Sequence, residues 1–179
     1  DGLFLDRPVT VNSTMTMTSG NINTTSTNIM TFVATTAITA SATSYIKGPF
    51  ARVIPANQVA GLTLNYPVGK DTLKPMFLVN PITNADGLTV ISAEVFEGNS
   101  GGTPGTGMLS LNTNRYFNAS IVSGDTNLVS TQVRLTEVNL TTTSGIGRSQ
   151  TVSGAYNLVS SALPSGGTIT TDALTSLSY

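Results

Sequence analysis

The chain of 179 residues contains no histidine, no cysteine and no tryptophan, and only 9% of its residues are charged. Without an imidazole or a thiol, it lacks the side chains that zinc and copper sites use most. It also lacks the imidazole base that activates the serine of a hydrolase. The sequence therefore predicts a protein that is not an enzyme and that needs no cofactor.

The few charges are balanced: 8 basic and 9 acidic residues give a net charge of −1. The basic residues form no stripe along the chain, so we expect no nucleic-acid partner. No apolar run approaches the length of a membrane helix, and the first residues show neither the basic region nor the apolar run of a signal peptide. We therefore expect no membrane insertion.

Threonine, serine and asparagine dominate the polar residues, while hydrophobic residues make up 39% of the chain. That content is enough for a core of ordinary size without a metal or a disulfide. An uncharged, hydroxyl-rich surface is common on extracellular β proteins, so we predict an extracellular or cell-surface location. The final TSLSY stops on an aromatic residue within a strand pattern, and we expect the native chain to continue beyond it.

Apolar and polar residues alternate in many short segments, as in VTV at 9–11 and TMTMT at 14–18. Period-two alternation and abundant β-branched residues favour strands that bury one face. The Gly-rich loop 98–107 and the Asp86-Gly87 pair mark turns between them. Strands at this spacing, joined by Gly-rich turns, predict an all-β fold. We expect an antiparallel β-sandwich of about seven or eight strands.

The chain divides into two regions that differ in the length of their predicted strands. Residues 1–54 form a Thr-rich lead-in of very short strands, arranged either as hairpins or as rungs of a β-solenoid. Residues 55–179 form the β-sandwich domain, either separate from the lead-in or sharing one continuous core with it. We expect the strands of the second region near 61–66, 75–80, 88–97, 108–112, 115–122, 128–138, 150–159 and 168–179.

Several landmarks follow one another in an order that resembles a known family. They are SYIKGPFARVI at 44–54, LNYPVGK at 64–70, Lys74-Pro75, AEVFEGNSGGTPGTG at 93–107, LSLNTNRYF at 109–117 and ALTSLSY at 173–179. Together they resemble the repeat domains of very large secreted cell-surface proteins of Bacteroidota. Phe117 stands where that family usually has tryptophan, and Tyr66 stands where it usually has phenylalanine, so both positions keep an aromatic ring.

The resemblance implies a non-enzymatic module of a surface adhesin or stalk that contacts neighbouring domains or further copies of itself. Exposed strand edges pair readily, and uncharged edges do so most easily. Leu3, Leu5, Val9 and Val11 form a terminal strand segment that could complete a neighbour's sheet. We therefore expect a structural or adhesive role, with assembly into filaments through this segment.

A binding module for a glycan or another surface polymer is the alternative. Sugar-binding platforms combine exposed aromatic rings with hydrogen-bonding side chains. Asn112, Asn114, Arg115 and Tyr116, next to the long Gly-rich loop, are the candidates for such a platform.

For metal ions, the sequence offers only isolated carboxylates. Calcium sites gather several oxygen ligands in one loop. Asp86 and Asp125 are the best placed candidates, but an aspartate in a turn more often bonds to its own backbone. We therefore predict no metal site, and Asp86 and Asp125 are the only candidate ligands.

Overall fold

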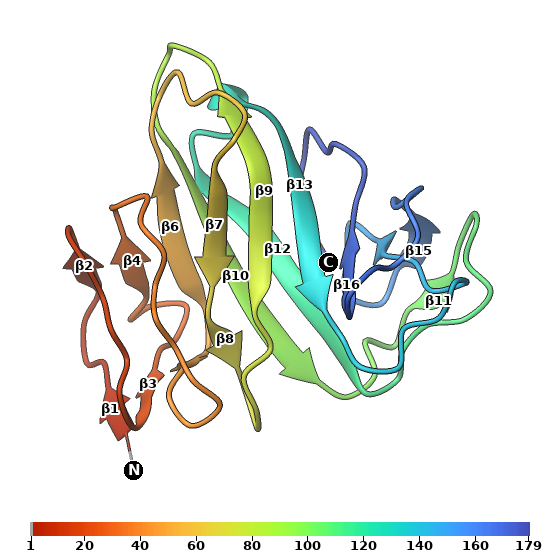
Figure 1. The fold of residues 1–179 in the computed structure, drawn as a ribbon, viewed down its shortest axis with the longest axis horizontal. Helices are drawn as coiled ribbons and strands as arrows, with labels where there is room; N and C mark the ends of the chain where they lie inside the picture. Colours follow the sequence, from red (N-terminus) through yellow and green to blue (C-terminus); the bar gives the residue numbers. More distant parts are fainter. Residues whose placement is uncertain (1) are drawn as a thin grey trace.

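The computed structural model describes residues 2–179, and this part of the chain is built from β-strands with one short 3₁₀ helix, η1 (Asp125–Asn127). Its strands form four sheets, and Figure 1 shows the long strands of two of them, one behind the other, in the middle of the molecule. The N-terminal coils lie at one end of the molecule and a small sheet lies at the other. The prediction of an all-β chain is confirmed.

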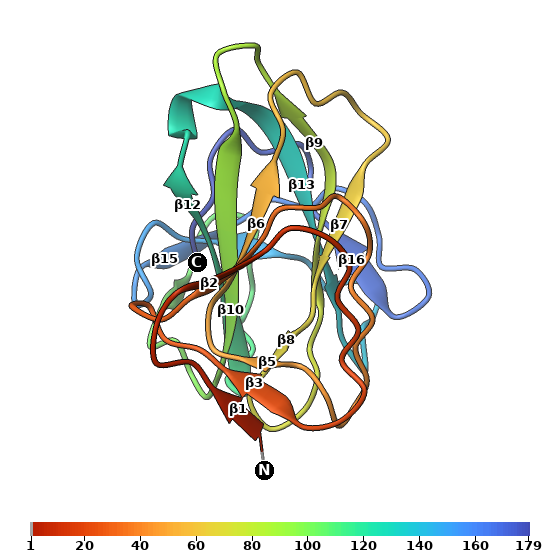
Figure 2. The ribbon, with the colours of Figure 1, turned by 90° about the vertical axis from the view of Figure 1, so that its left-hand side faces the viewer.

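The N-terminal region winds as a β-solenoid of about three turns. One parallel sheet has the order β1-β3-β5-β8, with bounds Gly2–Phe4, Asn21–Asn23, Ile46–Lys47 and Val68–Gly69. A second parallel set stacks β2 (Val9–Val11), β4 (Met30–Phe32) and β6 (Phe50–Ile54). A parallel bridge between Thr16 and Thr39 marks a third side. Figure 2 looks onto this coiled end.

The second parallel set continues into an antiparallel sheet. Strand β10 (Thr89–Glu97) pairs with β6 on one side and with β12 (Arg115–Ser123) on the other, which gives the order β12-β10-β6-β4-β2. A second antiparallel sheet packs against it, in the order β16-β13-β9-β7. Its strands are Thr168–Thr170, Leu128–Thr136, Met76–Thr83 and Thr63–Tyr66. One cluster of buried apolar side chains runs from Met17 in the coils to Leu174.

A small sheet closes the far end, in the order β11-β15-β14, with bounds Thr103–Pro104, Ala155–Leu158 and Gly147–Arg148. The C-terminal segment runs alongside β12, since the Ala119 N–H donates to the Ser178 carbonyl at 3.2 Å. Tyr179 and Ser149 exchange backbone hydrogen bonds of 2.7 and 3.1 Å. The chain end is thereby tied into both the main sheet and the small one.

The predicted antiparallel sandwich is wrong as a description of the fold, because the antiparallel sheets are only part of it: stacked parallel coils and further sheets make up the rest. Strand β2 pairs with β4, and β4 with β6, each about one coil further along the chain (9 to 30, then 30 to 50). Period-two alternation tells which face of a strand is buried, but it carries no information on which strand lies beside it or in which direction.

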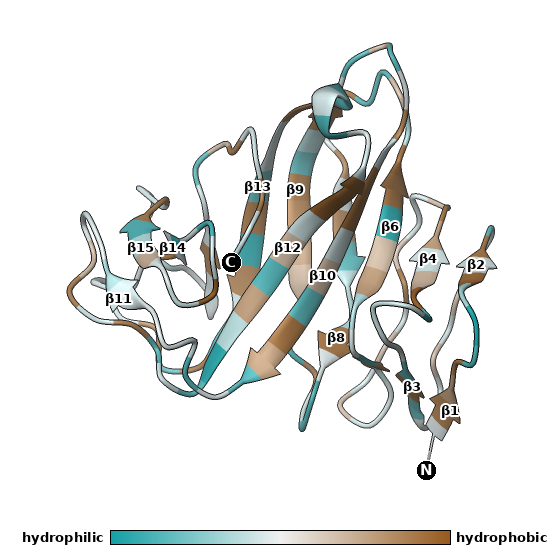
Figure 3. Ribbon diagram, turned by 180° about the vertical axis from the view of Figure 1, so that it is seen from behind, coloured by the Kyte–Doolittle hydropathy of each residue, from teal (hydrophilic) through white to brown (hydrophobic). Residues whose placement is uncertain are grey.

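Some of the predicted strands of the second region match observed strands, and others do not. Alternation predicted β9, β10, β12 and β13, and Figure 3 shows apolar and polar residues alternating along β10 and β12. The predicted strand at 108–112 is wrong, since this segment is irregular. It follows a turn at Thr106-Gly107 and pairs with no other strand among the described residues.

A buried arginine on β6 hydrogen-bonds to the segment 34–36 and to Asn65, and so links these parts of the solenoid. Arg52 lies on the inward face of β6 with 0% of its surface exposed, and its guanidinium carbon lies 5.0 Å from the centre of the Phe32 ring. Its Nη2 donates to the carbonyls of Ala34 (2.8 Å) and Thr36 (2.6 Å). Burial lowers the pKa of Arg52 to about 10, against 12.5 in water.

Asn65 completes this network from β7. Its carbonyl and its Oδ1 accept from Arg52 Nη1 at 3.0 and 3.1 Å. Its side-chain amide also accepts from the Ile38 N–H at 3.0 Å and donates to the Ile38 carbonyl at 2.7 Å, as a neighbouring strand would. Arg52 and Asn65 therefore replace backbone pairing where the coil 34–38 lies against β7.

Candidate functional site

The open end of the solenoid holds the four predicted assembly residues. Leu3 lies in β1 and is 56% exposed, Leu5 follows that strand, and Val9 and Val11 lie in β2. Within residues 2–179, β1 pairs only with β3 and β2 only with β4, so both are outer strands of their sheets. The structure thus brings the four residues to one end, on two adjacent edges and not on one strand.

An apolar hollow opens between these two edges. Its volume is about 840 Å³, and its lining includes the apolar side chains of Leu3, Val11, Met15, Met17, Ile22 and Met30. Phe4 stands beside it with 76% of its surface exposed. The interior of the first coil is therefore accessible from the end of the solenoid.

The predicted glycan platform is divided between two places. Asn112 and Asn114 lie in an exposed loop, where the Asn114 N–H donates to Asn112 Oδ1 at 2.8 Å. Arg115 and Tyr116 are neighbours on β12 and point to opposite faces of the sheet. Arg115 lies near Glu97 and Glu137 on the inner face, at 3.9 and 3.3 Å. The four side chains do not form one surface.

Tyr116 instead belongs to a row of three aromatic rings on the outer face. It stacks on Phe96 of the neighbouring strand, with ring centres 4.9 Å apart and planes inclined by 8°, and its centre lies 6.3 Å from that of Tyr179. All three residues are half-buried. Partial burial, and next the neighbouring Tyr179, raise the pKa of the Tyr116 hydroxyl above its usual 10.0.

Charged and polar groups border this aromatic row. Lys70 Nζ donates to Glu94 Oε1 at 2.9 Å and lies 5.4 Å from the centre of the Phe96 ring. Glu94 pairs with Asn118 across the two strands. Phe96 and Tyr179 were not among the predicted site residues, because only the register of β10 against β12 and the return of the C-terminus to β12 place them beside Tyr116.

The two candidate metal ligands lie in exposed turns at one end of the molecule. The Asp86 N–H donates to Asn84 Oδ1 at 3.0 Å, and the Asn84 side chain donates to the Thr126 carbonyl at 3.1 Å, next to Asp125. The two turns are therefore joined. Across residues 2–179, no group of three or more acidic, histidine or cysteine side chains could hold a metal ion.

Comparison with known proteins found no matching family model, no similar curated protein and no similar solved structure. The resemblance to surface repeat domains of Bacteroidota therefore stays a prediction. Among the described residues, no helix is long and apolar enough to cross a bilayer.

Proposed function

We propose that the protein is a non-enzymatic structural or adhesive module of an extracellular surface protein, and that it assembles by strand pairing at the open end of its solenoid. The observation that carries this proposal is the pair of unpaired parallel edges, β1 and β2, at the same end. The hydroxyl-rich, weakly charged composition supports an extracellular setting. The partner is a neighbouring domain or a further copy of the chain.

The two edges carry few of the features that prevent pairing. Edge strands that resist pairing with another chain carry charged side chains, proline or bulges, or are covered by another segment. Strands β1 and β2 contain neither charge nor proline, and Asp6 and Arg7 in the corner between them pair with each other at 3.4 Å. Another parallel rung would bury the exposed Leu3 and Phe4 side chains and cover the hollow.

Thr10 provides a sharp test of this assembly. The Val9 N–H and the Val11 carbonyl bond towards β4 and its flanking residues, so the Thr10 N–H between them points to the open edge. Thr10→Pro removes that donor without removing a hydrogen bond inside the molecule. We expect electron microscopy and light scattering to show filaments or larger assemblies of the native protein, and their loss in Thr10→Pro.

Thr10→Ala is the matched control, because it changes the same side chain and keeps the N–H. It should assemble as the native protein does, and both variants should keep the native melting temperature within a few degrees. A native protein that stays monomeric at all concentrations would overturn assembly, as would assemblies that Thr10→Pro leaves intact.

Glycan binding is the second candidate, and the outer aromatic row favours it. Rings of this kind pack against the apolar faces of sugars, while Glu94, Asn118 and Lys70 offer hydrogen bonds beside them. We expect Tyr116→Ser to weaken binding on an array of surface polysaccharides by about two- to tenfold, the range of one aromatic contact. Phe4→Ala, at the opposite end, should leave binding unchanged. Equal binding by both variants would contradict the assignment.

A further inference from the structure

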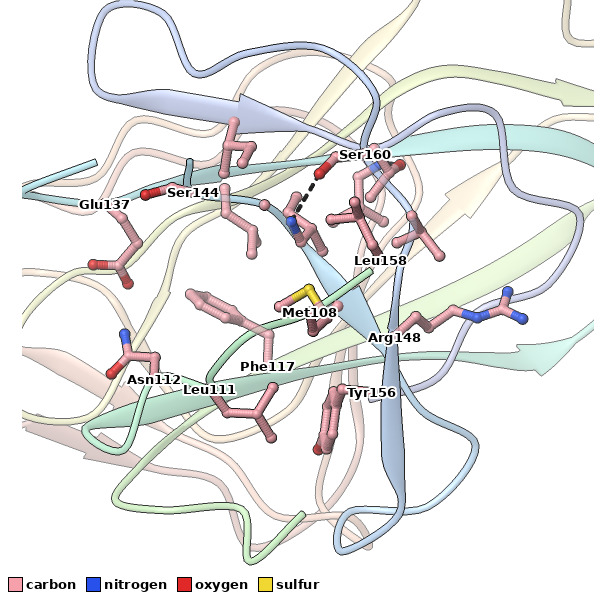
Figure 4. A pocket seen from close by; sticks show the side chains of 18 of the residues that line it. Met108, Leu111, Asn112, Phe117, Glu137, Ser144, Arg148, Tyr156, Leu158 and Ser160 are labelled. Carbon is pink, nitrogen blue, oxygen red and sulfur yellow. Dashed lines mark hydrogen bonds between the residues drawn. The ribbon is translucent and has the colours of Figure 1, made fainter. Parts of the chain in front are cut away.

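A second cavity lies at the end of the molecule away from the solenoid. Its volume is about 790 Å³, within the range typical of small-molecule sites. Parts of β12, β13 and the small sheet line it, together with loops around residues 107–112 and 138–146. In Figure 4, the side chains of Met108, Leu111, Phe117 and Leu158 converge on one space.

The lining continues outward into exposed apolar residues. Leu109, Val138 and Leu163 border the cavity and are 96%, 70% and 67% exposed. The rim of this cavity thus combines exposed apolar side chains with exposed polar ones such as Ser110, Asn139 and Thr142. Exposed apolar groups gathered around a hollow are typical of ligand sites.

One end of the cavity is polar and incompletely bonded. Arg115 and Glu137 both line it, with Arg115 Nε 3.3 Å from Glu137 Oε1. Their contact lacks hydrogen-bond geometry, so Arg115 Nε, Arg115 Nη1 and Glu137 Oε1 are buried without a hydrogen-bond partner. Buried polar atoms are usually satisfied, and leaving them unpaired is costly.

We propose that this cavity binds a small, largely apolar molecule that ends in a neutral group able both to donate and to accept a hydrogen bond, such as a primary amide or an alcohol. The acceptor of that group would take a hydrogen bond from the Arg115 guanidinium, and its donor would give one to the Glu137 carboxylate, where these two side chains line the cavity. Because Arg115 and Glu137 carry opposite charges, the attraction of either one for a carboxylate or an ammonium group is offset by repulsion from the other. An ion would therefore lose its hydration on entering the cavity without a net gain in charge attraction, whereas a neutral group loses less. This proposal is independent of the assembly role.

Three probes with the same alkyl chain test the head group. The neutral dye N-phenyl-1-naphthylamine, whose fluorescence rises in apolar surroundings, is bound to the full chain and displaced by octanamide, octanoate or octylammonium. We expect octanamide to bind at least about tenfold more tightly than either ion, as expected when a hydrogen bond to a charged group is lost. Absence of dye binding, or equal affinity for the three probes, would overturn the proposal.

Variants of the lining separate the site from non-specific binding. Glu137→Gln removes the charge that repels an anion, so octanoate should gain about tenfold relative to octanamide. Leu111→Trp should reduce binding of dye and octanamide at least tenfold by filling the space, whereas Val59→Trp, at an exposed position outside the cavity, should not. Circular dichroism checks that each variant is folded. An unchanged preference in Glu137→Gln, or equal effects of the two tryptophan variants, would contradict the assignment.

Discussion

Replacing Arg52 with methionine is expected to lower the free energy of unfolding by about 3–5 kcal/mol. Methionine fills a similar volume but donates no hydrogen bond, so the carbonyls of Ala34, Thr36 and Asn65 lose a charged donor inside the protein. Each unsatisfied buried acceptor costs about 1–3 kcal/mol. Loss of the cation–π contact with Phe32 adds to the effect.

Urea denaturation followed by circular dichroism measures this loss. Arg52→Lys keeps the positive charge but replaces the planar, five-donor guanidinium with a single ammonium group. The ammonium group cannot reach all the carbonyls that Arg52 bonds, so this variant should also be strongly destabilised. Arg7→Met is the control, because Arg7 is largely exposed and its ion pair with Asp6 contributes at most about 1 kcal/mol. If Arg52→Met cost no more than Arg7→Met, the Arg52 network would not hold the coil 34–38 in place.

Replacing Phe50 with alanine is expected to cost about 3–5 kcal/mol and to loosen both halves of the molecule together. Phe50 is completely buried on β6, the strand where parallel and antiparallel pairing meet. It pairs with Met30 on one side and with Ala93 on the other, and its ring packs edge-on against Tyr66 at 5.9 Å. The cavity left by its removal would therefore border the solenoid and the two antiparallel sheets.

Hydrogen exchange measured by mass spectrometry shows whether Phe50→Ala destabilises both halves of the molecule or only one. We expect protection to fall in residues 30–32 and in residues 89–97 by similar factors. Phe4→Ala, at an exposed ring, should change neither segment. Loss of protection confined to one of the two segments would show that they unfold separately and that Phe50 does not couple them.

Local pattern was enough to predict strands where one face is buried and the other is wet. In β10, Ile91, Ala93 and Val95 point inward, and the alternate residues Glu94 and Phe96 are half-buried on the outer face. The same rule could have separated Arg115 from Tyr116, because adjacent residues on a strand lie on opposite faces. The predicted glycan platform ignored that parity and combined side chains from two sides of one sheet.

Sites assembled from distant segments were beyond the reach of sequence patterns. The aromatic row joins residues 96, 116 and 179, and its geometry depends on the β10–β12 register and on the return of the C-terminus. Arg52 is one of the few charged residues of the chain, and arginine usually lies at the surface. Its burial depends on acceptors that two other segments supply, residues 34–36 and Asn65, so nothing near it in the chain indicates its position.

The sequence by itself determined the β character of this protein and excluded the chemistry of histidine and cysteine, because both follow from the residue types alone. It also determined much of the inward and outward alternation, since side-chain direction on a strand is a local property. Only the tertiary structure decided that the first strands stack in parallel coils, that β6 joins two kinds of pairing, and that Arg115 and Glu137 meet at a cavity. Pairing partner, direction and register are set by contacts between segments far apart in the chain, and these are absent from any local pattern.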